Sequence, residues 1–169
     1  MTTAAAEAPV EHVVALLRER LYGAISCLAT LAVLARYTDE NTSAWARILD
    51  VAVAAGGLWA ASLLAEFVAR LGVEGRAPRG PAAWGMLRSS GQILEAAVGP
   101  IVILIVSAIG VLETPTAVWL AMWFLVIEMA LIAFLAVRRT NLRWWQQALA
   151  VVALSALGAA VVAIKMIAH

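Results

Sequence analysis

Three glutamates, Glu66, Glu95 and Glu128, lie within long apolar runs of the sequence. A charged side chain at the centre of a membrane helix costs about 2.5–3.5 kcal/mol on insertion scales, so each of these residues needs a physical reason. Carboxylates in such positions can bind a proton or a small cation, form hydrogen bonds between helices, or act as general acids when protonated. All three roles depend on whether the surrounding chain is embedded in a membrane.

The composition indicates an integral membrane protein. The chain has 169 residues, of which 64% are hydrophobic and 14% charged, and its mean hydropathy is +0.92. Soluble domains have about 25% charged residues, and a domain of this size buries only part of its apolar surface. These values exclude a soluble globular enzyme, a disordered tail and a disulfide scaffold. The net charge of +1 gives no basic surface for nucleic acid, and a single cysteine cannot form an internal disulfide.

Five apolar segments approach or exceed the length of about 20 residues that crosses about 30 Å of hydrocarbon. The sequence therefore predicts an all-α bundle of five transmembrane helices in a single domain, residues 1–169. We expect the spans at about 21–37, 44–69, 92–112, 116–137 and 144–168. A longer connection rich in glycine and proline, about residues 70–91, separates the second span from the third.

The segment before the first span, residues 1–20, has the pattern of an amphipathic helix that runs into that span. Arginines lie at the end of this segment, in the connection after the second span and in the connection after the fourth. With five spans these three basic sets fall on the same side of the membrane. The excess of arginine on the cytoplasmic side then predicts an N-terminus inside and a C-terminus outside.

The expected spans place Glu66 and Glu95 about one turn from the cytoplasmic boundary, on consecutive helices. Gln92 lies one turn before Glu95, and Pro100 removes the hydrogen bond to the carbonyl of Ala96. A carboxylate, an amide and a free carbonyl on one half-helix would make a plausible cation or proton site.

The fourth expected span places Glu128 near the middle of the bilayer, without a polar partner on its own helix. It is therefore either protonated or paired with a donor from another helix. Other charges offer structural explanations. Arg70 lies one turn from Glu66, and Arg88 shares a helical face with Gln92 and Glu95. Asp50 and Lys165 are expected near the outer boundary, where they could pair with each other.

Motifs of common enzyme chemistry are absent from the sequence. There is no His/Cys cluster at metal-ligand spacing, no Ser-His-Asp set, no P-loop and no glycine-rich dinucleotide turn. We therefore expect no metal and no cofactor, and we do not expect an enzyme.

Four segments, Arg18–Ile25, Leu58–Glu66, Gly91–Glu95 and Ile164–His169, resemble small multi-pass membrane proteins of actinobacteria. The resemblance covers most of the chain and implies a bacterial plasma (inner) membrane. It implies no particular activity.

Three functions remain open. The first, which the sequence favours because three carboxylates in five helices exceed what packing requires, is translocation of protons or a small cation, with Glu66, Gln92, Glu95 and Glu128 along the path. The second is a non-transporting structural or assembly subunit, whose carboxylates make hydrogen bonds between helices. The third is a membrane-embedded enzyme acting on a lipid or isoprenoid, which a large apolar cavity lined by Glu128 would favour. Contact with membrane lipids is expected, and so is a homo-oligomer, because one copy has few helices to enclose a water path. Small-residue stripes such as Ala52, Gly56 and Ala60 allow close helix packing, either within the chain or between copies.

Overall fold

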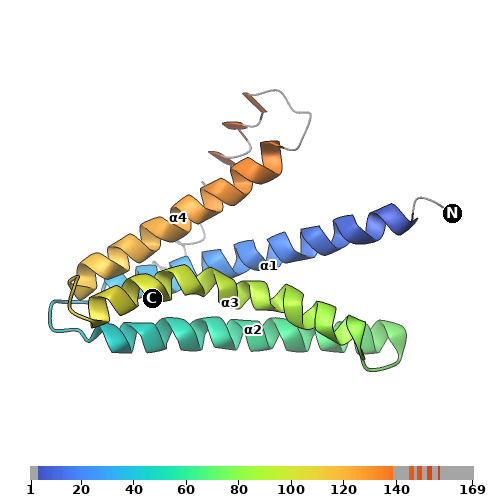
Figure 1. Ribbon diagram of the computed structural model, residues 1–169, viewed down its shortest axis with the longest axis horizontal. Helices are drawn as coiled ribbons and strands as arrows, with labels where there is room; N and C mark the ends of the chain where they lie inside the picture. Colours follow the sequence, from blue (N-terminus) through green and yellow to red (C-terminus); the bar gives the residue numbers. More distant parts are fainter. Residues whose placement is uncertain (1–3, 139–144, 147, 150–151, 154–155, 157–169) are drawn as a thin grey trace.

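The computed structural model contains four long α-helices (Figure 1). They are α1 (Ala4–Ala35), α2 (Ala44–Glu74), α3 (Pro81–Ala108) and α4 (Thr114–Arg138). The structure describes the backbone of residues 4–138 and the side chains of residues 13–135, together with residues 145, 146, 148, 149, 152, 153 and 156. Most of the predicted fifth span, 144–168, lies outside the described residues, and so does Lys165.

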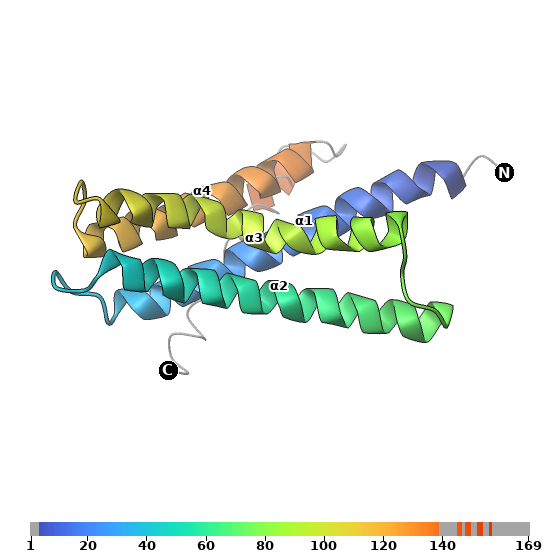
Figure 2. The same cartoon turned by 60° about the horizontal axis from the view of Figure 1, so that its bottom comes forward.

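The helices run alternately in opposite directions (Figures 1 and 2). One end of the bundle carries the α1–α2 and α3–α4 connections. The opposite end carries the N-terminus of α1, the α2–α3 connection and the C-terminal end of α4. The basic connection between α2 and α3 lies at this second end, and α4 ends there at Arg138, whereas Arg18 and Arg20 lie midway along α1. The number of spans and the side of the membrane remain predictions.

Three helices are long and apolar enough to cross a membrane: α2, α3 and α4. The protein is therefore membrane-embedded. The described part of α1 is not one of the helices long and apolar enough to span a membrane. Its apolar sequence is interrupted by Arg18, Glu19 and Arg20, so that only Leu21 to Ala35 form a continuous apolar stretch. This stretch is shorter than the predicted span 21–37, since α1 ends two residues earlier in a turn. The helix continues without a break from Ala4, although the predicted amphipathic face of residues 1–20 lies largely outside the described side chains.

The connection between α2 and α3 is much shorter than the predicted 70–91 segment. Helix α2 ends at Gly75, which has a φ of 65° and donates its N–H to the carbonyl of Leu71 at 3.0 Å. Helix α3 begins at Pro81, where a missing N–H costs nothing. Glycines 72, 85 and 91, which suggested a loop, are helical. The third span was predicted at 92–112, whereas α3 runs from Pro81 to Ala108. The predicted start therefore lies eleven residues after the observed one, and the predicted end four residues beyond it.

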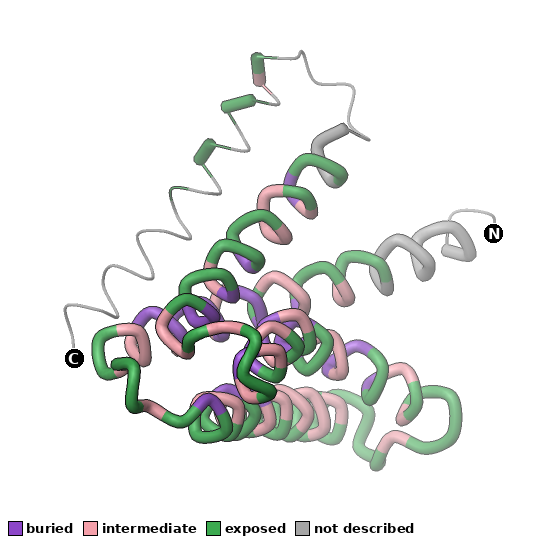
Figure 3. Tube along the Cα trace, turned by 60° about the vertical axis from the view of Figure 1, so that its left-hand side comes forward, coloured by how far each residue is buried: buried purple, intermediate pink, exposed green. Residues whose placement is uncertain are grey.

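Small side chains form the tightly packed core of the bundle. Ala24, Ala55, Ala96 and Ala121, one from each helix, are buried together with larger residues such as Leu31, Leu104 and Leu125. At Gly23 of α1 a Cβ would lie 2.8 Å from Ile93 Cα of α3, so only glycine permits this approach. By contrast, a Cβ on Gly56 would meet nothing within 4 Å, and Ala52 and Ala60 are exposed (Figure 3). The α2 stripe therefore does not form the contact between α2 and the other described helices.

Candidate functional site

A single arginine joins three helices beside this core. Arg20 of α1 donates from Nε to Oε1 of Glu128 on α4 at 2.7 Å, and its Nη2 donates to the same oxygen. Its Nη1 donates to Oε2 of Glu95 on α3 at 3.0 Å. We call Arg20, Glu95 and Glu128 the Arg20 cluster. Of the two alternatives for Glu128, the structure shows the second, a donor from another helix.

The members of the Arg20 cluster differ in burial. The Glu128 side chain is 13% exposed, that of Arg20 26% and that of Glu95 58%. With Arg20 and both glutamates ionised, the cluster has one positive and two negative charges, a net charge of −1. The second oxygen of Glu128, Oε2, is buried and has no hydrogen-bond partner among the described residues.

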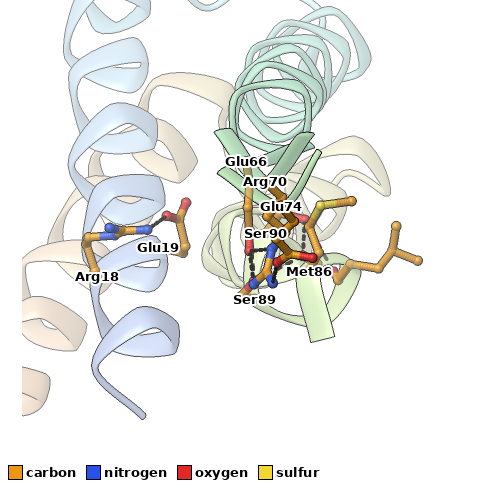
Figure 4. A network of polar contacts seen from close by, with 9 residues as sticks. Arg18, Glu19, Glu66, Arg70, Glu74, Met86, Ser89 and Ser90 are labelled. Atoms are coloured by element: carbon orange, nitrogen blue, oxygen red, sulfur yellow. Dashed lines mark hydrogen bonds and ion pairs between the residues drawn. The ribbon is translucent and has the colours of Figure 1, made fainter. Parts of the chain in front are cut away.

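A second cluster lies between α2 and α3, nearer the α2–α3 connection (Figure 4). Arg70 donates to Oε1 of Glu66 from Nε at 3.1 Å and from Nη2 at 2.9 Å, so the pair suggested by their spacing is present. The hydroxyl of Ser89 on α3 donates to Oε2 of Glu66 at 3.4 Å, and Glu74 lies 3.7 Å from Arg70. We call these four residues the Arg70 cluster.

Glu66 and Glu95 therefore have different surroundings, although the expected spans gave them matching depths. Glu66 is linked to α3 at Ser89, and Glu95 lies six residues further along, about 9 Å at 1.5 Å per residue. Glu95 shares Arg20 with Glu128 instead. The depth estimates differ because α3 begins eleven residues earlier than expected, which places Glu95 well inside the helix.

The remaining predicted site residues make no ion pair with either cluster, although one of them lies beside the Arg20 cluster. Gln92 lines a cavity described below, and Asp50 pairs with Arg47 one turn away at 3.2 Å, rather than with a described residue of another helix. Arg88 is exposed and makes no ion pair with the described residues.

Two residues of α1 that contact other helices, Arg20 and Glu19, are not among the site residues expected from the sequence. Glu19 is buried, accepts from Arg18 at 2.9 Å and accepts a hydrogen bond from Ser62 of α2 at 2.9 Å. A signal for Arg20 did exist, because it continues the helical stripe of buried residues at 24, 27, 28 and 31. We read Arg20 only as a marker of membrane orientation.

Helices α1 and α4 diverge towards one end of the bundle (Figures 1 and 3). An apolar cavity of about 500 Å³ adjoins the Arg20 cluster and is lined mainly by residues of these two helices. Its polar lining consists of Arg20, Gln92 and Glu128. The rest is apolar: Leu16, Leu17, Phe124, Ile127, Leu131, Ile132 and Leu135. Volume and lining are typical of a site for a small apolar molecule carrying a polar group.

Metal chemistry has no evident site in the part of the chain that the structure describes, where no three His, Cys, Asp or Glu residues are grouped to hold an ion. Comparisons with protein families, with curated proteins and with solved structures find no match to this chain.

Proposed function

We propose that this chain is a non-transporting subunit of a bacterial plasma membrane, in which arginine–glutamate contacts fix the arrangement of the helices. The observation that supports this function best is the contact of Arg20 with both Glu95 and Glu128. One side chain of α1 thereby holds α3 and α4. Buried charges that have partners of opposite sign are explained by packing and do not require an ion path.

The contacts of Glu128 argue against the enzyme hypothesis. A general acid must hold a proton, whereas Oε1 of Glu128 accepts two hydrogen bonds from a guanidinium, which is the contact of a carboxylate. The cavity beside Glu128 is of the expected kind, but the group that would donate the proton is in an ion pair.

Translocation of protons or a small cation remains the second candidate, for one specific reason. The two carboxylates of the Arg20 cluster exceed its one arginine, and Glu95 is 58% exposed. An exposed carboxylate connected through arginine to a carboxylate that is only 13% exposed could exchange protons between surface and interior.

Flux measurements distinguish these two functions. The full chain is reconstituted in liposomes containing a pH-sensitive dye, and proton and K⁺ flux is compared with that of protein-free liposomes. A structural subunit gives no additional flux, and Glu128→Gln lowers the melting temperature of the protein in detergent. Glu74→Gln, which removes a carboxylate at the end of α2, is the matched control. A wild-type flux that Glu95→Gln abolishes without changing the melting temperature would overturn the structural function in favour of ion translocation.

A homo-oligomer is part of the proposal. The stripe of Ala52, Gly56 and Ala60 on α2, exposed at both alanines and open at Gly56, offers a surface where another copy could approach closely. Light scattering of the purified protein, with the detergent contribution subtracted, measures the number of copies. A mass of one chain would contradict this part of the proposal and leave the function of the Arg20 cluster unaffected.

A further inference from the structure

We propose that the cavity between α1, α3 and α4 binds a membrane-soluble organic cation, a protonated amine or quaternary ammonium group on an apolar body. This inference goes beyond the structural function and does not depend on it. It rests on the coincidence of an apolar space, an excess of negative charge and an aromatic ring.

The apolar part of the lining determines the kind of molecule. Seven of the ten lining residues are aliphatic or aromatic, and they come from α1 and α4. A volume of about 500 Å³ lies within the range of about 300–1,000 Å³ found for small-molecule sites. A hydrated inorganic ion would gain nothing from such a surface, whereas an apolar organic molecule is stabilised by leaving water.

The charge of the adjoining cluster determines the sign of the ligand. Arg20 contacts both Glu95 and Glu128, which leaves one negative charge uncompensated among the described residues. In surroundings of low dielectric constant this charge attracts a cation and repels an anion more strongly than it would in water. Glu128 lines the cavity and its buried Oε2 has no described partner. Arg88, one turn from Gln92, is exposed and does not line the cavity.

The ring of Phe124 adds a second source of attraction for a cation. Phe124 lines the cavity, and its ring lies against Gly99 of α3 so closely that a Cβ there would collide with it. Gly99 therefore makes room for the ring in this position. The face of an aromatic ring attracts organic cations within about 6 Å.

Two probes of nearly equal shape and opposite charge test the proposal. Tetraphenylphosphonium and tetraphenylborate are titrated against the purified full chain in a non-ionic detergent, and binding is measured by equilibrium dialysis against protein-free micelles. We expect saturable binding of the phosphonium at one site per chain. The borate should bind at least about tenfold more weakly.

Charge-neutralising variants locate the site. Glu128→Gln brings the net charge of the Arg20 cluster to zero and should weaken phosphonium binding at least about tenfold. Glu95→Gln has the same electrostatic effect at a more exposed position, so it keeps the test valid if Glu128→Gln does not fold. Glu74→Gln removes one negative charge from the chain as well, but away from the cavity, and should leave binding unchanged.

Three results would overturn the proposal. Equal or tighter binding of the borate would show that the excess negative charge does not select the ligand. Equal binding to Glu95→Gln and the wild type would place the phosphonium elsewhere. Absence of saturable binding in the full chain would mean that another occupant, such as residues 144–168 or a second copy, fills the space.

Discussion

The Arg20 cluster and the Arg70 cluster use the same chemistry, an arginine between two carboxylates, but they connect different parts of the chain. Arg70 contacts Glu66 and Glu74, each one turn away on its own helix. Arg20 contacts glutamates that are 75 and 108 residues away in sequence. A local pair stabilises a helix by a few tenths of a kcal/mol, whereas a pair between helices also determines how they pack. The comparison suggests that charge type alone does not reveal which membrane carboxylates matter to the fold.

The largest expected effect is the loss of Arg20. Arg20→Leu leaves Glu128, whose side chain is 13% exposed, without its partner. Removal of one member of a fully buried pair costs about 3–5 kcal/mol, and the 26% exposure of Arg20 lowers this cost. We expect a clear fall in the midpoint of unfolding in detergent, followed by circular dichroism. The double variant Arg20→Leu/Glu128→Leu removes both charges and should recover most of the loss. If the double variant were as unstable as the single one, the loss of stability in Arg20→Leu would not come from the unpaired Glu128.

The next largest effect is expected at the approach of α1 to α3. Gly23→Ala places a Cβ 2.8 Å from Ile93 Cα and 3.1 Å from its carbonyl oxygen, and backbone atoms cannot move aside as a side chain end can. Overpacking of this kind costs about 1–3 kcal/mol, and it would also move Arg20, one turn away.

Gly57→Ala is the matched control for this prediction, because a Cβ on Gly57 meets nothing within 4 Å. Alanine is the better helix former by about 1 kcal/mol, so this control should be neutral or slightly stabilising in the same unfolding experiment. Equal unfolding midpoints for the two alanine variants would refute the close approach.

A smaller effect is expected in the Arg70 cluster. Glu66→Gln weakens an intrahelical pair whose side chains are 29% and 37% exposed, and such pairs contribute about 0.3–0.5 kcal/mol. The unfolding midpoint should therefore change far less than in Arg20→Leu. A loss comparable to that of Arg20→Leu would show that the link from Glu66 to Ser89 of α3 matters as much as the Arg20 contacts.

The smallest effect is expected in the α1–α2 turn, outside the membrane-spanning helices. The hydroxyl of Thr42 donates to Oδ1 of Asp39 at 2.6 Å, and this hydrogen bond is the main cause that lowers the pKa of Asp39 below its ordinary value of 3.8. A lowered folded-state pKa adds stability at higher pH, and this contribution is lost as the pH falls through that pKa. Asp39→Asn should therefore be slightly less stable than the wild type at pH 6, with the difference shrinking as the pH falls below 3.8. A difference that persists at low pH would assign the effect to another cause.

Much of the fold follows from the sequence. The observed α2 begins at the predicted residue, and α4 lies within two residues of its predicted bounds at both ends. Long apolar runs fix such helices, because a membrane helix must satisfy its backbone hydrogen bonds internally. The start of α3 was missed because glycines at 85 and 91 resemble a loop, while the residues that interrupt the helices, Gly75 and Gly80, have positive φ.

The candidate site followed from the sequence less completely. All three glutamates were identified, since carboxylates in apolar runs are conspicuous. Their partners were found only for Glu66, where the arginine is four residues away. Glu95 and Glu128 share Arg20 as their partner because three helices pack together. The spacing of residues within one helix does not give the distances between side chains of different helices.

The continuity of α1 has a mechanical consequence. From Val10 to Arg20 the helix runs without a proline, a rod of about 15 Å ahead of the three-helix junction. A rod transmits torque, and each residue of a helix corresponds to about 100° of rotation. A protein or lipid surface that turned the first part of α1 by even a fraction of that angle would draw the guanidinium away from α3 and α4 together. A rotation of the first part of α1 would thus change the contacts of Arg20 with Glu95 and Glu128, although the described residues of that part of the helix make no ion pair with these glutamates.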